Sequence, residues 1–478
     1  MIVGGMMLLT LLKKEIQDYL ISIRFVVLLA LCVLLIPLSL YVNFETYRRW
    51  SADYNEQVKS ESTKGSRGRG GRSGLRPPSA LSVFANGVET SLAKDFSIDS
   101  PRIIFGTGRS YGDPIYETFG RIDFLFVVQS VLSLIALLFA FDAISGEKEL
   151  GTLKLAMSNP VPRYKILLAK FAGGMIVLIA PFVVSFSIGS TILVFAGYPL
   201  FQKIILAKVA LILLLTAIYI GLFFVLGLFV STLTHQSKTA LIVLMFVWVV
   251  LVLGVPRLSM MAAKVLRPVD DDSVVTLRSR LLVESINKEK GSALKQLYFD
   301  KAREKKLGPG LLTFDSSDPE FVRKRNEIAG PFEARMREEL ARIDADQQRK
   351  RQAQLNLARN IARISPASLL SYLMTDIADT GEHTKVRFLD AVRLHYSTLD
   401  RLIFSKSYSD TISDGDRGWG FGGNLPGQET PDPPRFSFSF PRTAESLAHS
   451  LVDIGLLLAC AVALFAAASV AFIRYDVR

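Results

Sequence analysis

Long apolar runs dominate the pattern of hydrophobic and polar positions along this chain. Six of them qualify as membrane spans, because a helix needs about 20 mostly apolar residues to cross a bilayer with every backbone amide satisfied internally. They cover 25–44, 122–144, 171–197, 204–233, 239–258 and 447–473. The first run is too long for a signal peptide and no small-residue cleavage site follows it, so we interpret it as a retained span. We therefore predict an all-α membrane protein with about six transmembrane helices.

Lysine and arginine in the short loops fall on one side of the predicted membrane. Such residues mark the cytoplasmic side, whereas long segments cross largely regardless of their charge. They are Lys13, Lys14 and Arg24 before the first span, Lys148, Lys154, Arg163, Lys165 and Lys170 between the second and third, Lys238 between the fourth and fifth, and Arg474 and Arg478 after the sixth. We therefore expect a multi-pass protein of the bacterial cytoplasmic (inner) membrane. Both termini, 1–24 and 474–478, and the loop 145–170 would be cytoplasmic, and segments 45–121 and 259–446 would lie outside.

Two segments near the first span have distinctive patterns. Residues 8–21 place leucine, isoleucine and tyrosine near helical spacing, with Lys13 and Lys14 on another face. This predicts an amphipathic helix along the cytoplasmic membrane interface, with an ordinary cytoplasmic helical extension as the alternative. The tract 65–78 reads GSRGRGGRSGLRPP, and its glycines and like charges predict a flexible loop.

The segment between the fifth and sixth spans is charged and helical in pattern. Apolar residues recur there at three- and four-residue steps, which predicts helices over about 272–306 and 318–364. The sequence Gly308-Pro309-Gly310 between them favours a fold-back into an antiparallel hairpin. After 364 the pattern becomes less regular, and 415–434 is a Gly/Pro-rich connector. We predict a large, mainly helical extracytoplasmic insert.

Composition and charge exclude several classes of function. The net charge of +12 comes from scattered basic residues without a basic face and interleaved aromatics, so we expect no nucleic-acid partner. The cysteines, Cys32 and Cys460, lie inside apolar runs, and the four histidines show no metal-ligand spacing. Gly146 and Gly151 have the spacing of a phosphate-binding loop, but Thr152 stands where lysine is needed. We therefore expect no cofactor, no metal and no catalytic site in this chain.

Polar residues inside the spans are candidates for a transport path, because they are costly in lipid and usually face a bundle interior. Glycines in the spans can instead allow close packing of helices. The candidates for path or packing are Gln129, Ser187, Gly189, Thr216, Gly221 and Asp453. For Asp453, near a span end, snorkelling to the interface is the alternative.

The most informative segment is the cytoplasmic stretch 142–170, DAISGEKELGTLKLAMSNPVPRYKILLAK. Charged residues alternate there with the apolar contacts Leu150, Leu153, Leu155 and Met157. Asn159, Pro160 and Pro162 then end the helix. A short amphipathic helix held between two spans is suited to receive force from a soluble partner, with leucines for burial and charges for register.

Two motifs carry a resemblance to a known family. The order Ile144-Ser145-Gly146-Glu147-Lys148-Glu149-x-Gly151-Thr152-Leu153, followed by Ser158-Asn159-Pro160-Val161-x-Arg163 and Ile166-Leu167-Leu168-Ala169-Lys170, resembles the cytoplasmic loop of ABC-2 type transporter permeases. Within that family it is similar to the branch that includes the permeases of copper-site maturation and gliding-motility systems. The second and less specific motif is Ile364-Ser365-Pro366-Ala367-Ser368 followed by Asp379-Thr380-Gly381.

The resemblance implies a permease subunit of an exporter, with a separate ABC ATP-binding subunit and a second permease chain, identical or related, as partners. ATP hydrolysis would then occur only in the partner subunit. The positions that would contact the ATP-binding subunit are Glu147, Lys148, Glu149, Gly151, Thr152, Leu153 and Arg163. The outer insert departs from compact members of the family, and it would be a lid, a dimer contact or a dock for an extracytoplasmic protein. The alternative is a membrane sensor or scaffold, without transport, whose outer helical domain binds envelope proteins.

Overall fold

The structure, a computed structural model, contains six helices within its described residues that are long and apolar enough to cross a membrane. It describes residues 2–64, 73–87, 95–99, 102–106, 123–158, 162–304, 319–410, 435–441 and 443–475. The six candidate spans are Ile23–Ser60, Phe124–Glu149, Arg163–Phe195, Lys203–Leu233, Ser237–Leu266 and Ser450–Arg474. The predicted all-α membrane fold is therefore confirmed, and the spans are numbered one to six below.

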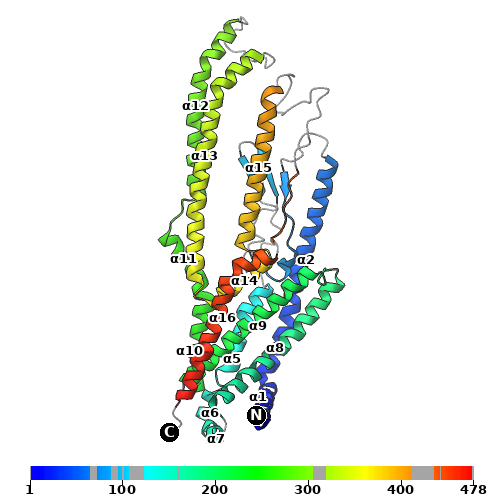
Figure 1. Cartoon of the computed structure of the whole chain (residues 1–478), viewed down its shortest axis with the longest axis vertical. Helices are drawn as coiled ribbons and strands as arrows, with labels where there is room; N and C mark the ends of the chain where they lie inside the picture. The colour runs from blue at the N-terminus through cyan, green and yellow to red at the C-terminus, as the bar shows by residue number, and fades with distance from the viewer. Residues whose placement is uncertain are drawn as a thin grey trace.

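The spans pack as a bundle around span four. Span one covers most of α2 (Ile23–Lys64). Span two begins with α4 (Phe124–Phe126), the π-helical turn η3 (Val127–Leu132) and α5 (Ser133–Ala140), and continues to Glu149. Spans three and four are α8 (Arg163–Phe195) and α9 (Lys203–Leu233). Span five joins α10 (Ser237–Trp248), the π-helical turn η4 (Val249–Gly254) and α11 (Val255–Leu266), and span six lies in α16 (Thr443–Arg474). Since α9 contacts α5, α8, α10 and α16, the core lies along it (Figure 1).

Glycines allow the spans to approach closely, as the sequence suggests for two of them. A Cβ atom at Gly189 would lie 2.8 Å from Leu40 Cδ1, and one at Gly221 would lie 3.2 Å from Met175 Cε. At Gly227 an added Cβ would lie 2.4 Å from the Cβ of Ala140. Gly189 and Gly221 therefore lie at contacts between spans, which is the packing role of small residues in membrane helices.

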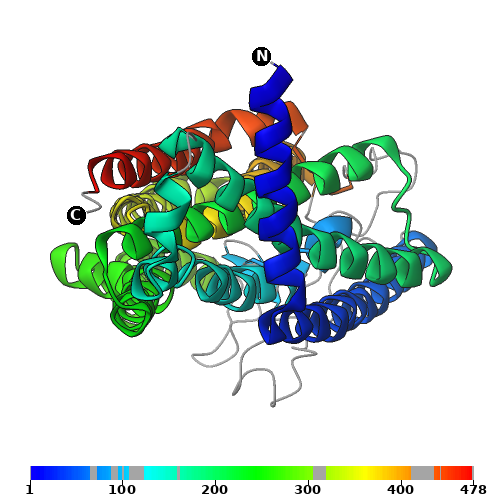
Figure 2. The same cartoon turned by 90° about the horizontal axis from the view of Figure 1, so that it is seen from below.

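The N-terminal helix α1 (Ile2–Ile21) crosses the lower end of the bundle. Figure 2 shows it from the side, whereas the spans above it are seen closer to end-on. It packs against α8, and Lys13 and Lys14 are exposed. The segment expected to be an amphipathic helix is thus helical and lies across the ends of the spans.

Two long helices rise from span five, and we call them the outer hairpin: α12 (Asp272–Glu304) and α13 (Pro319–Ala362). They lie side by side in Figure 1. Lys290 pairs with Glu333 and Arg335 with Glu289, while Arg351 near the end of α13 meets Asp272 at the start of α12. This register is antiparallel, as the sequence predicts, and the linker with Gly308, Pro309 and Gly310 lies outside the described residues.

Regular structure also occurs where the sequence pattern indicated little. After residue 364 the chain forms α14 (Pro366–Ile377) and α15 (Glu382–Asp410). In the first outer segment, a turn of 3₁₀ helix η1 (Ala80–Val83) accompanies an antiparallel sheet of β1 (Ser73–Leu75), β2 (Asp95–Asp99) and β3 (Arg102–Gly106), in that order. Most of the predicted flexible tract (65–72) and all of the connector (415–434) lie outside the described residues.

An aromatic cluster attaches this sheet to α15. Phe96 of β2 is buried against Phe388 of α15 and against Phe436, with ring centroids 6.4 and 4.8 Å apart. The buried guanidinium of Arg76 lies 4.8 Å from the ring centroid of Trp50 on α2. Beyond the spans, α2, α15 and the sheet therefore form a second outer lobe, beside the outer hairpin (Figure 1).

A substitution tests the close packing of spans two and four. Gly227→Ala would place a methyl group against Ala140, and overpacking of this kind costs about 1–3 kcal/mol. We expect the variant to have a lower thermal unfolding midpoint in detergent. Thermal denaturation monitored by size-exclusion chromatography measures this midpoint. The matched control is Gly455→Ala in span six, where a Cβ meets nothing within 4 Å and the midpoint should stay or rise. Equal midpoints for the two variants would contradict this packing.

Candidate functional site

The stretch that the sequence predicts to be cytoplasmic folds into a bent pair of short helices, which we call the elbow (residues 142–158). Its helices are α6 (Ser145–Glu149) and α7 (Thr152–Ser158), joined by Leu150 and Gly151. Gly151 has φ of +75°, a left-handed conformation that favours glycine, and it ends α6 with little strain. The chain therefore turns sharply between the helices, and the turn lies at the lower end of the bundle (Figure 1).

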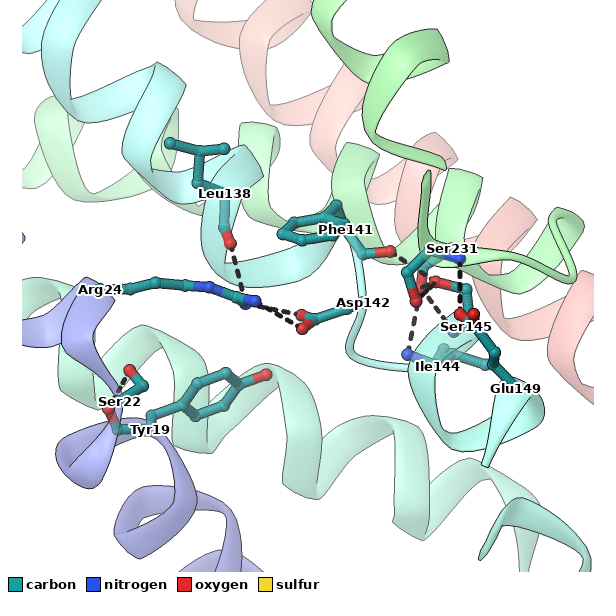
Figure 3. Close-up of polar contacts among 11 residues, drawn as sticks. Tyr19, Ser22, Arg24, Leu138, Phe141, Asp142, Ile144, Ser145, Glu149 and Ser231 are labelled. Atoms are coloured by element: carbon teal, nitrogen blue, oxygen red, sulfur yellow. Dashed lines mark hydrogen bonds and ion pairs between the residues drawn. The ribbon is translucent and has the colours of Figure 1, made fainter. Parts of the chain in front are cut away.

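An ion pair ties the start of the elbow to span one. Arg24 donates from Nη1 to Asp142 Oδ1 at 2.8 Å and from Nη2 to Asp142 Oδ2 at 2.7 Å, and its Nη1 also donates to the Leu138 carbonyl at 3.2 Å. Figure 3 shows the guanidinium reaching across to this carboxylate. Because the guanidinium makes two parallel hydrogen bonds to the carboxylate, this contact is directional as well as electrostatic, and we call it the Arg24 fork.

The body of the elbow is held by the end of span four and the start of span five. Ser231 Oγ accepts hydrogen bonds from the backbone N–H groups of Ile144 and Ser145, at 3.1 and 2.9 Å, which satisfies donors that a helix start leaves open (Figure 3). Lys148 Nζ donates to two carbonyls at the end of α9, those of Thr232 and Thr234. This is where a helix dipole favours a cation.

A similar contact joins the end of α6 to span five. Glu149 Oε2 accepts from the backbone N–H of Ser237, at 3.2 Å. Ser237 is the first residue of α10, where the helix dipole favours an anion.

A buried lysine joins the elbow to α1. Lys170 Nζ lies 3.0 Å from Glu15 Oε1 and 2.8 Å from Glu147 Oε1, and its side chain is only 4% exposed. A charge out of water is tolerated only with opposite charges beside it, so these two carboxylates are what makes the position possible. Burial, reinforced by nearby carboxylates, raises the pKa of the adjacent Tyr19 phenol, which therefore stays neutral.

The segment after the elbow contacts the end of span six. Arg163 Nη1 donates to the carbonyls of Ile473 and Tyr475 at 2.7 and 2.8 Å, which satisfies acceptors at the C-terminus of α16. Lys148 Nζ lies 4.3 Å from the ring centroid of the same tyrosine. The elbow is therefore connected to spans one, three, four and five, to the end of span six through Lys148 and Tyr475, and to α1 through Lys170.

The exposed surface of the elbow includes two leucines. Leu150 is 79% exposed and Leu155 is 72% exposed, whereas Leu153 between them is buried. Thr152 and Lys154 are exposed as well. Single exposed leucines are common, but Leu150 and Leu155 lie on either side of one glycine turn, on an element that is otherwise anchored.

The residues predicted to contact an ATP-binding subunit thus occupy different places. Glu147, Lys148 and Arg163 hold the elbow to the bundle, and Leu153 is buried beneath it. Glu149, Gly151 and Thr152 are exposed, and Glu149 also binds Ser237. Contact of this set with another protein stays a prediction. The sequence named Leu150 and Leu155 as apolar contacts without separating them from Leu153, since the turn at Gly151 was not predicted.

The polar candidates inside the spans are satisfied within the bundle. Gln129 lies in the π-helical turn of span two. Its backbone carbonyl accepts a hydrogen bond from the Tyr219 hydroxyl at 2.8 Å, and its side-chain Oε1 accepts one from Ser371 of α14 at 3.2 Å. Thr216 is buried and bonds to the carbonyl four residues earlier, as does the exposed Ser187. These bonds remove the cost of a polar group in lipid without requiring a path.

Asp453 lies deeper in the fold than a residue that snorkels to the interface. Its carboxylate is fully buried, and Arg359 of α13 and Arg363, the residue that follows α13, each reach it at 2.6 Å. Arg359 also lies 3.2 Å from Asp376 of α14. We call this cluster the clasp.

The second motif forms a junction on the outer side of the spans. Ser365 caps α14 by accepting from the N–H groups of Ala367 and Ser368. At the other end of α14, Asp379 has φ of +58°, a conformation that aspartate adopts more readily than most residues, and pairs with the buried Lys208 of α9.

Two further contacts complete this junction. Ser446 of α16 donates to Asp379 Oδ1 at 3.3 Å, and Thr380 donates to the Ala85 carbonyl at 2.8 Å. Burial raises the pKa of the Asp379 carboxyl, although Lys208 beside it opposes that rise. The less specific of the two motifs is therefore a connection between α9, α14, α16 and the first outer segment.

Comparison with known proteins gives two matches. A family model described as ABC-2 family transporter protein matches residues 9–477. A probable ABC transporter permease protein NosY of Stutzerimonas stutzeri is 53% identical over 51 residues, which are 10% of this chain and 18% of that protein. The chain thus matches less than a fifth of the length of this curated relative.

The buried lysine of the elbow makes a stability prediction. Lys170→Met leaves Glu15 and Glu147 without their cation, and breaking a buried ion pair by removing one partner costs about 3–5 kcal/mol. We expect a lower unfolding midpoint and faster proteolytic cleavage of α1, measured by limited trypsin digestion in detergent. Lys154→Met, at an exposed position, is the control. Unchanged cleavage of α1 in Lys170→Met would show that the pair does not hold this helix.

Proposed function

The chain belongs to the ABC-2 family of transporter proteins, and from this premise we propose that it is the permease subunit of an ATP-driven transporter whose ATP-binding subunit docks on the elbow. The observation that carries this proposal is the pair of exposed leucines, Leu150 and Leu155, on an element otherwise anchored to the bundle. Burying a leucine contributes about 1.5–3 kcal/mol, so this surface supports a specific contact. Exposed Lys154 and Glu149 would set its orientation.

The anchoring contacts explain how a partner at the elbow would move the spans. A push on α6 or α7 is resisted by Lys170, by Ser231 and by the Arg24 fork, and each lies on a different helix. The elbow therefore cannot shift without loading those helices, because their buried polar groups would lose their partners. Docking energy would thus become movement of spans rather than local bending of a loop.

The remaining roles follow from this arrangement. ATP hydrolysis is assigned to the separate subunit, and this chain supplies no catalytic, cofactor or metal site in our proposal. A second permease chain, identical or related, would cover the exposed stripe of span five, which comprises Ile242, Phe246, Val249, Val250 and Leu253. The elbow and both termini would face the cytoplasm across the bacterial inner membrane. Substrate would move outward, the direction that the family resemblance suggests.

Purification of the tagged chain tests the docking surface. We expect an ATP-binding subunit to co-purify with wild type in mild detergent, and Leu150→Glu with Leu155→Glu to reduce its recovery by about tenfold or more, since about 1.4 kcal/mol of lost burial suffices. Leu394→Glu, equally apolar and 66% exposed on α15, is the matched control. Mass spectrometry identifies the bound protein and an ATPase assay measures its activity.

Two outcomes would count against this function. If the elbow variant and the Leu394 variant recover the ATP-binding subunit equally well, the docking site must lie outside the elbow. Recovery of envelope proteins through the outer helices, with no ATP-binding subunit in several detergents, would favour the sensor or scaffold.

A further inference from the structure

Span six contacts the elbow at one end of the bundle and the base of the outer hairpin at the other. At its lower end, Arg163 binds the carbonyls of Ile473 and Tyr475, and Lys148 of the elbow lies over the ring of that tyrosine. At its upper end, Asp453 is enclosed by Arg359 and Arg363 at the base of the outer hairpin. Between these contacts α16 is one uninterrupted helix. The two contacts, at Asp453 and Ile473, lie about 30 Å apart along its axis.

The clasp is a contact that resists opening. Asp453 has 0% exposure, whereas the side chains of Arg359 and Arg363 are 28% and 26% exposed. If α13 moved away from α16, the carboxylate would lose both cations within the interior, where an unpaired charge is strongly disfavoured. The base of α13 and the upper part of α16 must therefore move together.

The same base is attached to two further elements. Arg359 pairs with Asp376 of α14, and Ser365 at the start of α14 donates to the Leu251 carbonyl in the π-helical turn of span five. A π-helical turn leaves carbonyl groups without their usual helical partners, and such turns are frequent at functional sites. The hairpin is thus attached at its base to spans five and six and to α14.

The outer hairpin is long enough to amplify a small rotation at its base. Helix α13 has 44 residues and therefore extends about 66 Å. It begins at Pro319, far from the bundle, and ends at the clasp (Figure 1). A tilt of its lower end by a few degrees would displace its far end by several ångströms, because displacement grows with length.

From these contacts we propose that α16 couples the elbow to the outer hairpin through the clasp of Asp453, Arg359 and Arg363. The inference rests on the proposed function for its biological use: a subunit docked on the elbow would load the lower end of α16, and the hairpin would move outside the membrane. Conversely, a protein that binds the outer hairpin and restricts its movement would change the position of the elbow. Asp453 is therefore a positioning residue, and it lies outside the surface on which the ATP-binding subunit docks.

Hydrogen–deuterium exchange of the full chain in lipid nanodiscs tests this coupling without any partner. The variant Arg363→Gln weakens the clasp, but Arg359 still pairs with Asp453, so the fold should be retained. The variant Asp453→Asn removes both ion pairs of the clasp. We expect amides of residues 145–158 to exchange roughly three- to tenfold faster in Arg363→Gln, the effect of a coupling of usual size between distant sites. The larger effect is expected for Asp453→Asn if that chain folds.

The control is Arg342→Gln, which breaks exposed ion pairs with Glu338 and Glu339 on the same helix and should leave the elbow unchanged. The segment 73–87, also on the outer side, reports general loosening. Faster exchange confined to the neighbourhood of residues 359–380 and 446–456 would overturn the proposal, and so would equal acceleration at the elbow and at 73–87. Because the measurement involves no ATP-binding subunit, its failure is separate from failure of the docking test.

Discussion

Charged groups taken out of water must be paired, and this constraint determines how the helices of the protein are joined. Lys170, Lys208 and Asp453 are each almost fully buried, and each meets an opposite charge on another element. Lys170 lies at the cytoplasmic end of the bundle in our orientation, and the other two lie at the outer end. Apolar packing along span four holds the middle, but it is nondirectional. The ion pairs add direction, because each fixes which helix faces which.

This arrangement separates an anchored part of the elbow from an exposed part. Glu147 and Lys148 face inward and help to hold the elbow to the surrounding helices, while Leu150 and Leu155 face outward. An exposed apolar surface on a rigid support is what a force-receiving contact needs, because a flexible support would absorb the displacement. Membership of the ABC-2 transporter family supports our proposal that this contact belongs to an ATP-driven cycle.

Hydropathy was sufficient to predict the six spans, because the bilayer imposes a length and an apolar composition on each helix. The outer hairpin was also predictable, from its periodicity. The partners of Lys208 and Asp453 were not, since they lie 171 and about 90 residues away along the chain and no local pattern connects them. Helix α14 was missed because it is short and follows Ser365-Pro366, a pattern that marks a helix start without predicting its length. The inward direction of Glu147 and Lys148 depends on Lys170 and on the carbonyls at the end of α9, and the spacing of residues did not indicate these partners.

The most direct test of the central claim is photo-cross-linking from the elbow in the native membrane. A photoreactive amino acid would replace Leu155, and in a control chain it would replace Val462, which is 68% exposed on span six. Our account requires that residue 155, and not residue 462, forms a covalent adduct with an ABC ATP-binding subunit, and that ATP changes the yield of this adduct. An adduct with no nucleotide-binding protein, or the same adduct from both positions, would contradict the elbow as the place where ATP-driven movement enters the membrane domain.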